Sequence, residues 1–336
     1  MMDITSLRKA LLDPKIYPDL PGEVRFTETH ISLLFFTGKH VYKVKKPVNF
    51  GFLDFTSLEK RRYFCEQEVT LNRRLAPRIY LGVVSIVDDG GWISLGGKGE
   101  VREYAVKMRQ IPEESLMDKL LEKGRVTPKM IEGVSEKLTQ FYSLAETNEF
   151  ISRFGRPERV RQDTDENFEQ TERYINVTIS QTVYEEIRKR TNQFFKNREK
   201  LFHRRMDSGH IRDCHGDLRL EHMVWDDEVS IYDCIEFNQR FRYTDVAADL
   251  AFLAMDLDYR GRGDLNEPLI RTYVEKSGDQ RLIEALDFYK CYRAYVRGKV
   301  ESFRLDDLDI PEEEKTEALK RAQKYFALSF QYAQKF

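Results

Sequence analysis

The first third of the chain carries hydrophobic residues with the spacing of β-strands. Residues 31–36 and 40–45 are rich in β-branched and aromatic side chains, and the Thr-Gly-Lys between them supplies a turn, which predicts a β-hairpin. The capping-box pattern Thr56-Ser-Leu-Glu59 predicts a helix that runs to about Leu75. The predicted strands of this part are 31–36, 40–45, 80–87, 92–95 and 101–108.

Beyond Pro112 the hydrophobic residues recur mainly with the period of α-helices. The charged segment 165–205 predicts two antiparallel helices or one interrupted helix, and Asp245 opens a helix that is apolar on almost every side. Further helices are predicted over 114–123, 128–147 and 312–335, short strands over 223–225 and 230–237, and a loop over 238–243. The pattern predicts an α+β chain of two parts: a β-rich lobe with one helix over 1–110, and a larger helical lobe over 111–336.

Two charged residues of the smaller lobe fall on apolar stripes. Lys43 shares one face of its predicted strand with Val41, where a solvated lysine is not expected. Glu68 lies on the same helical stripe as Phe64 and Leu71. A buried carboxylate needs a partner, and Lys43 is the natural candidate. The alternative is a glutamate at the rim of the core that reaches water.

The stretch Asp213-Cys-His-Gly-Asp-Leu-Arg-Leu-Glu-His-Met-Val-Trp225 concentrates titratable groups in a predicted turn. Asp217 is presented there with Arg219, Glu221 and His222 within six residues. Loops of this density of acid, base and cation are typical of functional sites. The simpler interpretation is a solvated polar turn.

A second acid lies in the apolar helix that Asp245 opens. Asp249 stands among alanines and leucines in this helix. A buried acid must be hydrogen-bonded, and the backbone of a nearby loop is a plausible partner.

Composition limits the classes of protein to consider. The 336 residues include 41% hydrophobic residues, enough for a sizeable core, while 55 basic and 57 acidic side chains nearly cancel. This balance gives no electrostatic reason to expect nucleic acid or a membrane as a partner. The four cysteines are far apart and form no CxxC pair, and no signal peptide is visible, so we expect a reduced, cytoplasmic protein. The sequence leaves the oligomeric state open.

Three motifs together resemble a known family. His215-Gly-Asp217 with Leu218 resembles the HGDLHxxN catalytic loop of the aminoglycoside phosphotransferase and choline kinase group. The segment Cys234-Ile-Glu-Phe-Asn238 is similar to the metal-binding Ile-Asp-Phe-Gly of that group, and 245–251 to the helix start that follows it. The resemblance implies a protein-kinase-like fold of two lobes, use of ATP with Mg²⁺, and a small-molecule hydroxyl as acceptor.

Other segments are closer to one bacterial branch of aminoglycoside phosphotransferase-like proteins, which are often fused to a P-loop kinase domain. These segments are 41–55, 58–62 and 237–243, and the resemblance runs from about Thr27 to the C-terminus. The P-loop pattern GxxxxGK[ST] itself does not occur in this sequence.

The resemblance implies roles for individual residues. Lys43 would hold the α and β phosphates of ATP, and Glu68 would hold Lys43 in place. Asp217 would accept or orient the proton of the acceptor hydroxyl, and Arg219 would stabilise charge on the transferred phosphoryl group. The adenine hinge would be formed by Met108, Arg109, Gln110 and Ile111, and His215 and Asp249 would support the catalytic loop.

The sequence departs from the family at the two positions that bind the metal. His222 stands where the family has a metal-binding Asn, and Glu236 where it has the Asp of Asp-Phe-Gly. Since Mg²⁺ prefers oxygen ligands, Glu221 would supply the missing oxygen, or a softer ion such as Mn²⁺ would be used. Asp233 is the alternative to Glu236, although the spacing from the catalytic loop favours Glu236.

Two other functions compete with a small-molecule kinase. The departures at His222 and Glu236 would fit a pseudokinase that works as a nucleotide- or protein-binding module. The chain could also be a metal-dependent hydrolase, with a transition-metal site built from His210, His215, Asp217, Glu221 and His222.

Overall fold

The computed structural model describes residues 3–336 and divides the chain into two compact units. The first, which we call the sheet unit, comprises Met1–Gly124 and Glu221–Gln239. The second, the helical unit, comprises Arg125–Leu220 and Arg240–Phe336. The chain therefore returns to the sheet unit after the His215-Gly-Asp217 loop, whereas the sequence analysis assigned everything beyond residue 110 to one helical lobe.

The sheet unit is built on six antiparallel strands in the order β1-β2-β3-β6-β4-β5. The strand missing from the prediction is β1, which has three exposed residues among its four and so no clear hydrophobic pattern. The strands are β1 (Arg25–Glu28), β2 (Ser32–Phe36), β3 (His40–Lys45), β4 (Tyr80–Asp89), β5 (Trp92–Leu95) and β6 (Glu100–Arg109).

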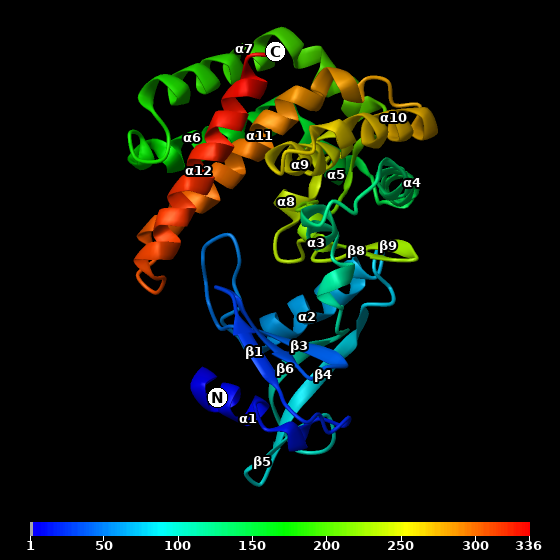
Figure 1. The fold of residues 1–336 in the computed structure, drawn as a ribbon, viewed down its shortest axis with the longest axis vertical. Coiled ribbons are helices and arrows are strands. Elements are labelled where there is room, and N and C mark those ends of the chain that lie inside the picture. The colour runs from blue at the N-terminus through cyan, green and yellow to red at the C-terminus, as the bar shows by residue number, and fades with distance from the viewer. Residues whose placement is uncertain (1–2) are drawn as a thin grey trace. The chain divides into compact units, whose positions relative to one another are not determined.

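Two helices pack against opposite faces of this sheet (Figure 1). On one side α1 (Ile4–Leu11) shares a core with Tyr42 and Val44 of β3. On the other side α2 (Leu58–Asn72) packs with Val41. Because side chains alternate along a strand, Lys43 and Lys45 face the same side as Val41, toward α2.

The returning segment of the sheet unit forms a hairpin of β8 (Met223–Asp226) and β9 (Glu228–Ile231). The predicted strand over 230–237 is wrong beyond Ile231, because Asp233 has a left-handed backbone with φ of 63° that an extended strand cannot contain. The short helix α3 (Met117–Glu122) completes this unit.

The helical unit contains the long helices that the periodicity predicted. The charged segment forms two helices, α6 (Pro157–Thr171) and α7 (Gln181–Asp207), with a non-helical residue at Arg198 inside the second. The predicted loop over 238–243 contains a one-turn helix, α8 (Gln239–Arg242), whose first residue belongs to the sheet unit. The remaining elements are α4 (Pro128–Leu144), α5 (Glu149–Ser152), α6 (Pro157–Thr171), α7 (Gln181–Asp207), β7 (Ile211–Asp213), β10 (Tyr243–Asp245), α9 (Val246–Tyr259), α10 (Asn266–Ser277), α11 (Leu282–Phe303) and α12 (Glu312–Ala333).

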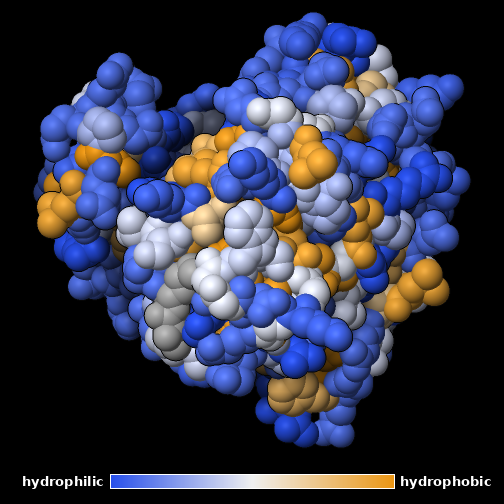
Figure 2. All heavy atoms as spheres, turned by 90° about the horizontal axis from the view of Figure 1, so that it is seen from below, coloured by the Kyte–Doolittle hydropathy of each residue, from blue (hydrophilic) through white to orange (hydrophobic). Residues whose placement is uncertain are grey.

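The centre of the helical unit is α9, which is buried along nearly its whole length and packs against α11. Asp245 caps its start by accepting a hydrogen bond from the Ala247 amide. All four cysteines are buried as free thiols. Within residues 3–336, no helix combines the length and apolar character that crossing a bilayer requires. The face drawn in Figure 2 is mainly hydrophilic with small apolar patches.

Candidate functional site

Two lysines of β3 share one glutamate of α2. The Nζ atom of Lys43 lies 2.8 Å from Oε1 of Glu68, so the ion pair predicted from the two apolar stripes is present. The Nζ atom of Lys45 lies 2.6 Å from Oε2 of the same carboxylate. The sequence analysis missed Lys45. The two-residue period of a strand places it on the same side as Lys43, but that pattern does not indicate that its side chain is buried.

Lys45 is the most deeply buried of these cations. Its side chain is 0% exposed, and it also forms an ion pair with Glu236. The ring of Phe55 lies 4.9 Å from its Nζ atom, so an aromatic face covers the ammonium group. Glu236 is thereby engaged inside the core of the sheet unit.

The ion-pair cluster of Lys43, Lys45, Glu68 and Glu236 shifts the pKa values of its own side chains. Burial alone would raise the pKa of Glu68, but the charges of Lys43 and Lys45 outweigh it and the pKa is lowered. Burial would likewise lower the pKa of Lys43, yet Asp233 and Glu68 raise it well above its ordinary value. The pKa of Glu236 is raised by burial, which Lys45 only partly offsets. The lysines are therefore held in the charged form.

Glu68 should make the stability of the sheet unit depend on pH in the acid range. Because its folded pKa is lowered, its contribution is fully present above the unfolded value of 4.5 and is lost as the pH falls through the lower, folded pKa. We expect Glu68→Gln to flatten the fall in unfolding free energy below about pH 4.5. Urea unfolding at several pH values measures this. The half-exposed Glu66 of the same helix provides the control, since Glu66→Gln should leave the acid slope unchanged.

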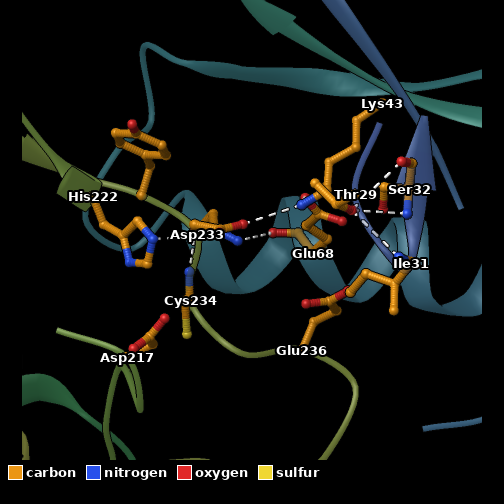
Figure 3. Close-up of polar contacts among 12 residues, drawn as sticks. Thr29, Ile31, Ser32, Lys43, Glu68, Asp217, His222, Asp233, Cys234 and Glu236 are labelled. Carbon is orange, nitrogen blue, oxygen red and sulfur yellow. Dashed lines mark hydrogen bonds and ion pairs between the residues drawn. The ribbon is translucent and has the colours of Figure 1, made fainter. Parts of the chain in front are cut away.

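The open end of the β8–β9 hairpin carries two further acidic side chains, Asp233 and Glu221. The Nζ atom of Lys43 lies 3.1 Å from Oδ1 of Asp233, and Figure 3 shows Lys43 directed toward Asp233 and Glu68. The Nε2 atom of His222 lies 3.6 Å from Oδ2 of Asp233 and 3.7 Å from Oε1 of Glu221. Spacing in the sequence favoured Glu236 as the metal ligand, but Asp233 is the acid that lies beside both Lys43 and His222.

Helix α2 and strand β4 hold the segment Asp233-Cys234, which follows the hairpin and which we call the acidic loop. The amide of Cys234 donates to Oδ1 of Asn72 at 2.8 Å, and the amide of Asp233 donates to the Tyr80 hydroxyl at 3.3 Å. Asn72 lies one turn after Glu68, so a single helix fixes both the lysines and the acidic loop.

Two backbone amides of the predicted hinge already donate hydrogen bonds within the sheet unit. The amide of Arg109 donates to the Ile79 carbonyl at 2.8 Å, and the amide of Gln110 donates to the Lys39 carbonyl at 3.0 Å. These two amides are therefore engaged within the sheet unit. The Arg109 side chain pairs with Asp226 at 3.2 Å.

In the helical unit the His215-Gly-Asp217 loop is held through hydrogen bonds to its backbone. Asp249 accepts hydrogen bonds from the amides of His215 at 3.0 Å and Gly216 at 2.9 Å, which confirms the predicted contact with loop backbone. Arg293 of α11, which the sequence analysis missed, donates to the Gly216 carbonyl at 3.3 Å. Gly216 has a φ of 89°, a conformation that favours glycine, so the turn before Asp217 is fixed from two helices.

Asp217 and Arg219 form a bidentate ion pair. The Nε and a terminal nitrogen of Arg219 lie 2.9 and 2.8 Å from the two carboxylate oxygens of Asp217. The amide of Leu220, the next residue, donates to Asp256 of α9 at 3.0 Å. The loop thus presents a preorganised acid and cation.

Within the helical unit, the two histidines proposed for a hydrolase site have separate partners. His210 lies 3.5 Å from Asp279, and His215 is fully buried, where its Nδ1 lies 3.3 Å from the Asp217 amide. Across residues 3–336, no group of three or more histidine, cysteine, aspartate or glutamate side chains is arranged to hold a metal ion.

The chain is similar in sequence to uncharacterised proteins of Mycobacterium tuberculosis and Mycobacterium bovis. Each is 32% identical over 308 residues, which cover 91% of this chain and 59% of the relative. The chain thus spans about three fifths of the length of these relatives. No protein-family model matches it.

Solved structures share the fold at low sequence identity. A choline/ethanolamine kinase family protein from Mesorhizobium loti superposes with a TM-score of 0.52 at 12% identity, covering 98% of this chain and 99% of that one. A choline kinase from Streptococcus pneumoniae gives 0.50 at 14% identity, covering 96% and 99%. The sheet unit with its Lys43–Glu68 pair and the helical unit with its clamped His-Gly-Asp loop therefore have the kinase-like fold of the choline and ethanolamine kinase structures.

Proposed function

We propose that this chain is an ATP-dependent phosphotransferase that moves the γ-phosphate to a hydroxyl of a small molecule. The observation that carries the proposal is the Lys43–Glu68 ion pair, formed between a strand and a helix of a kinase-like fold. The proteins of like fold are named as kinases of choline and ethanolamine, so a small hydroxyl compound is the class of acceptor to test.

The sheet unit would bind the nucleotide. Lys43 would pair with the α and β phosphates, and Glu68 would keep its ammonium group directed toward them. Partly buried apolar residues on the same side of the sheet, Leu34 and Val83, with Ile111 of the hinge, support binding of an adenine ring.

The helical unit would act on the acceptor. The acceptor oxygen attacks the γ-phosphorus, the bond from that phosphorus to the bridging oxygen breaks, ADP leaves, and the hydroxyl proton passes to Asp217. Asp217 is held by the clamped backbone and by Arg219, so positioning contributes more than basicity. Arg219 would stabilise negative charge on the transferred group.

A divalent ion would neutralise charge on the phosphates. The chain offers the carboxylate of Asp233 and the imidazole of His222 near Lys43, a donor set that suits Mg²⁺ poorly because that ion prefers oxygen ligands.

A second candidate function is a nucleotide-binding pseudokinase. Arg219 engages both carboxylate oxygens of Asp217, which would oppose proton transfer if the ion pair persisted with substrate bound. Nucleotide turnover that depends on Asp217 separates the two functions, because a pseudokinase would bind nucleotide without it.

Loss of Lys43 should abolish nucleotide binding. At a hundredfold excess over its dissociation constant, ATP with a divalent ion should stabilise the wild type by about 2.7 kcal/mol and raise its melting temperature by a few degrees. We expect no such rise for Lys43→Met, and a full rise for Lys98→Met, which removes an exposed lysine of the same unit. A thermal-unfolding series with Mg²⁺, Mn²⁺ and no metal measures this. An equal rise in Lys43→Met would refute the assigned phosphate site.

A further inference from the structure

The β8–β9 hairpin places an imidazole and a carboxylate at its open end. The register pairs Met223 with Ile231, and the amide of Tyr232 donates to the His222 carbonyl at 2.9 Å, which continues the ladder by one residue. Asp233 follows directly, and its left-handed backbone starts the turn away from the hairpin. His222 and Asp233 are therefore neighbours because of the hairpin register, although eleven positions separate them.

The two oxygens of Asp233 face different partners. Oδ1 lies 3.1 Å from Nζ of Lys43, and Oδ2 lies 3.6 Å from Nε2 of His222. Lys43 thus orients the carboxylate so that its second oxygen is on the imidazole side. The Asp233 side chain is 44% exposed, whereas Glu236 is buried against Lys45.

The separation of these donors suits a shared metal ion. Two ligands of one ion at ordinary bond lengths stand about 3–3.5 Å apart, so a small movement would bring Nε2 and Oδ2 onto the same ion. Ions that bridge nucleotide phosphates take few protein ligands and complete their shell with phosphate oxygens and water. A pair of protein donors is therefore sufficient here, without a cluster of three.

We propose that the nucleotide-bound divalent ion is held by Nε2 of His222 and Oδ2 of Asp233, and that this site selects a manganese-type ion over Mg²⁺. This inference rests on the proposed nucleotide binding. Imidazole binds first-row transition metals well and Mg²⁺ poorly, so the nitrogen donor sets the selectivity. The Glu221 carboxylate lies 3.7 Å from the same Nε2 and is not needed as a ligand.

Pulsed electron paramagnetic resonance of bound Mn²⁺ tests the nitrogen ligand directly. The full chain is labelled with ¹⁵N-histidine and loaded with Mn²⁺ and a non-hydrolysable ATP analogue. We expect a ¹⁵N coupling on Mn²⁺ in the wild type, its loss in His222→Asn, and its retention in the control His203→Asn, which changes an exposed histidine of α7. Absence of the coupling in the wild type, with nucleotide bound, would overturn the inference.

Metal preference in nucleotide binding provides a second measurement. The wild type should bind the analogue at least about tenfold more tightly with Mn²⁺ than with Mg²⁺, and His222→Asn should reduce or reverse this ratio because an amide oxygen replaces the imidazole. Equal affinities with both ions in the wild type would leave the proposed phosphotransferase standing and overturn the selectivity. Failure to bind nucleotide with any ion would overturn the proposed function and this inference together.

Discussion

Replacing Lys45 by methionine should lower the unfolding free energy of the sheet unit by about 3–5 kcal/mol. The Lys45 side chain is fully buried and its ammonium group pairs with Glu68 and Glu236. Methionine fills a similar volume but leaves the Glu236 carboxylate buried without its cation. Removing one member of a buried ion pair is more destabilising than removing both, because the remaining charge keeps its desolvation cost.

Urea unfolding, monitored by tryptophan fluorescence, measures this loss of stability in the sheet unit. Both tryptophans of the chain, Trp92 and Trp225, belong to the sheet unit. The double variant Lys45→Met with Glu236→Gln should recover part of the lost stability. The control Lys46→Met, which breaks a partly exposed pair with Glu28, should cost less than about 1 kcal/mol. If Lys45→Met has the unfolding free energy of the wild type, the claim that Lys45 stabilises the buried Glu236 carboxylate is wrong.

Periodicity was sufficient to predict three residues whose burial conflicts with their charge. Lys43 and Glu68 fall on apolar faces of a strand and a helix, and Asp249 falls within an apolar helix, so each needed a partner. The structure supplies those partners within one unit in each case. The kinase-like fold itself was implied by the family resemblance of the His-Gly-Asp loop and the segments that follow it.

Other parts of the site depend on contacts that no local pattern encodes. Lys45 is followed by Lys46 and resembles the solvated end of a strand. It is buried because Glu236, from a distant segment, and the ring of Phe55 lie against its ammonium group. The choice between Asp233 and Glu236 depends on the backbone turn at Asp233, which spacing alone does not reveal. Arg293 supports the His-Gly-Asp loop from a helix more than seventy residues away.

Asp217→Asn should reduce phosphoryl transfer by about 10²–10⁴-fold, the usual contribution of a positioned acid or base. Asparagine keeps the size of the side chain and one acceptor oxygen for Arg219, but it cannot take a proton from the acceptor hydroxyl. Nucleotide affinity should be unchanged, since Lys43 and Glu68 belong to the sheet unit. Isothermal titration with the ATP analogue checks this, and lost affinity in Asp217→Asn would contradict the assignment.

Turnover of ATP is the measurement that tests the central claim most directly. Phosphorus NMR would follow ATP, ADP and any new phosphate ester for the wild type and Asp217→Asn, with Mg²⁺ or Mn²⁺ and a panel of small hydroxyl compounds. The account predicts ADP together with a phosphate ester in the wild type, and loss of both in Asp217→Asn. Bound nucleotide that is never consumed, with any acceptor or ion, would contradict a phosphotransferase and favour the pseudokinase.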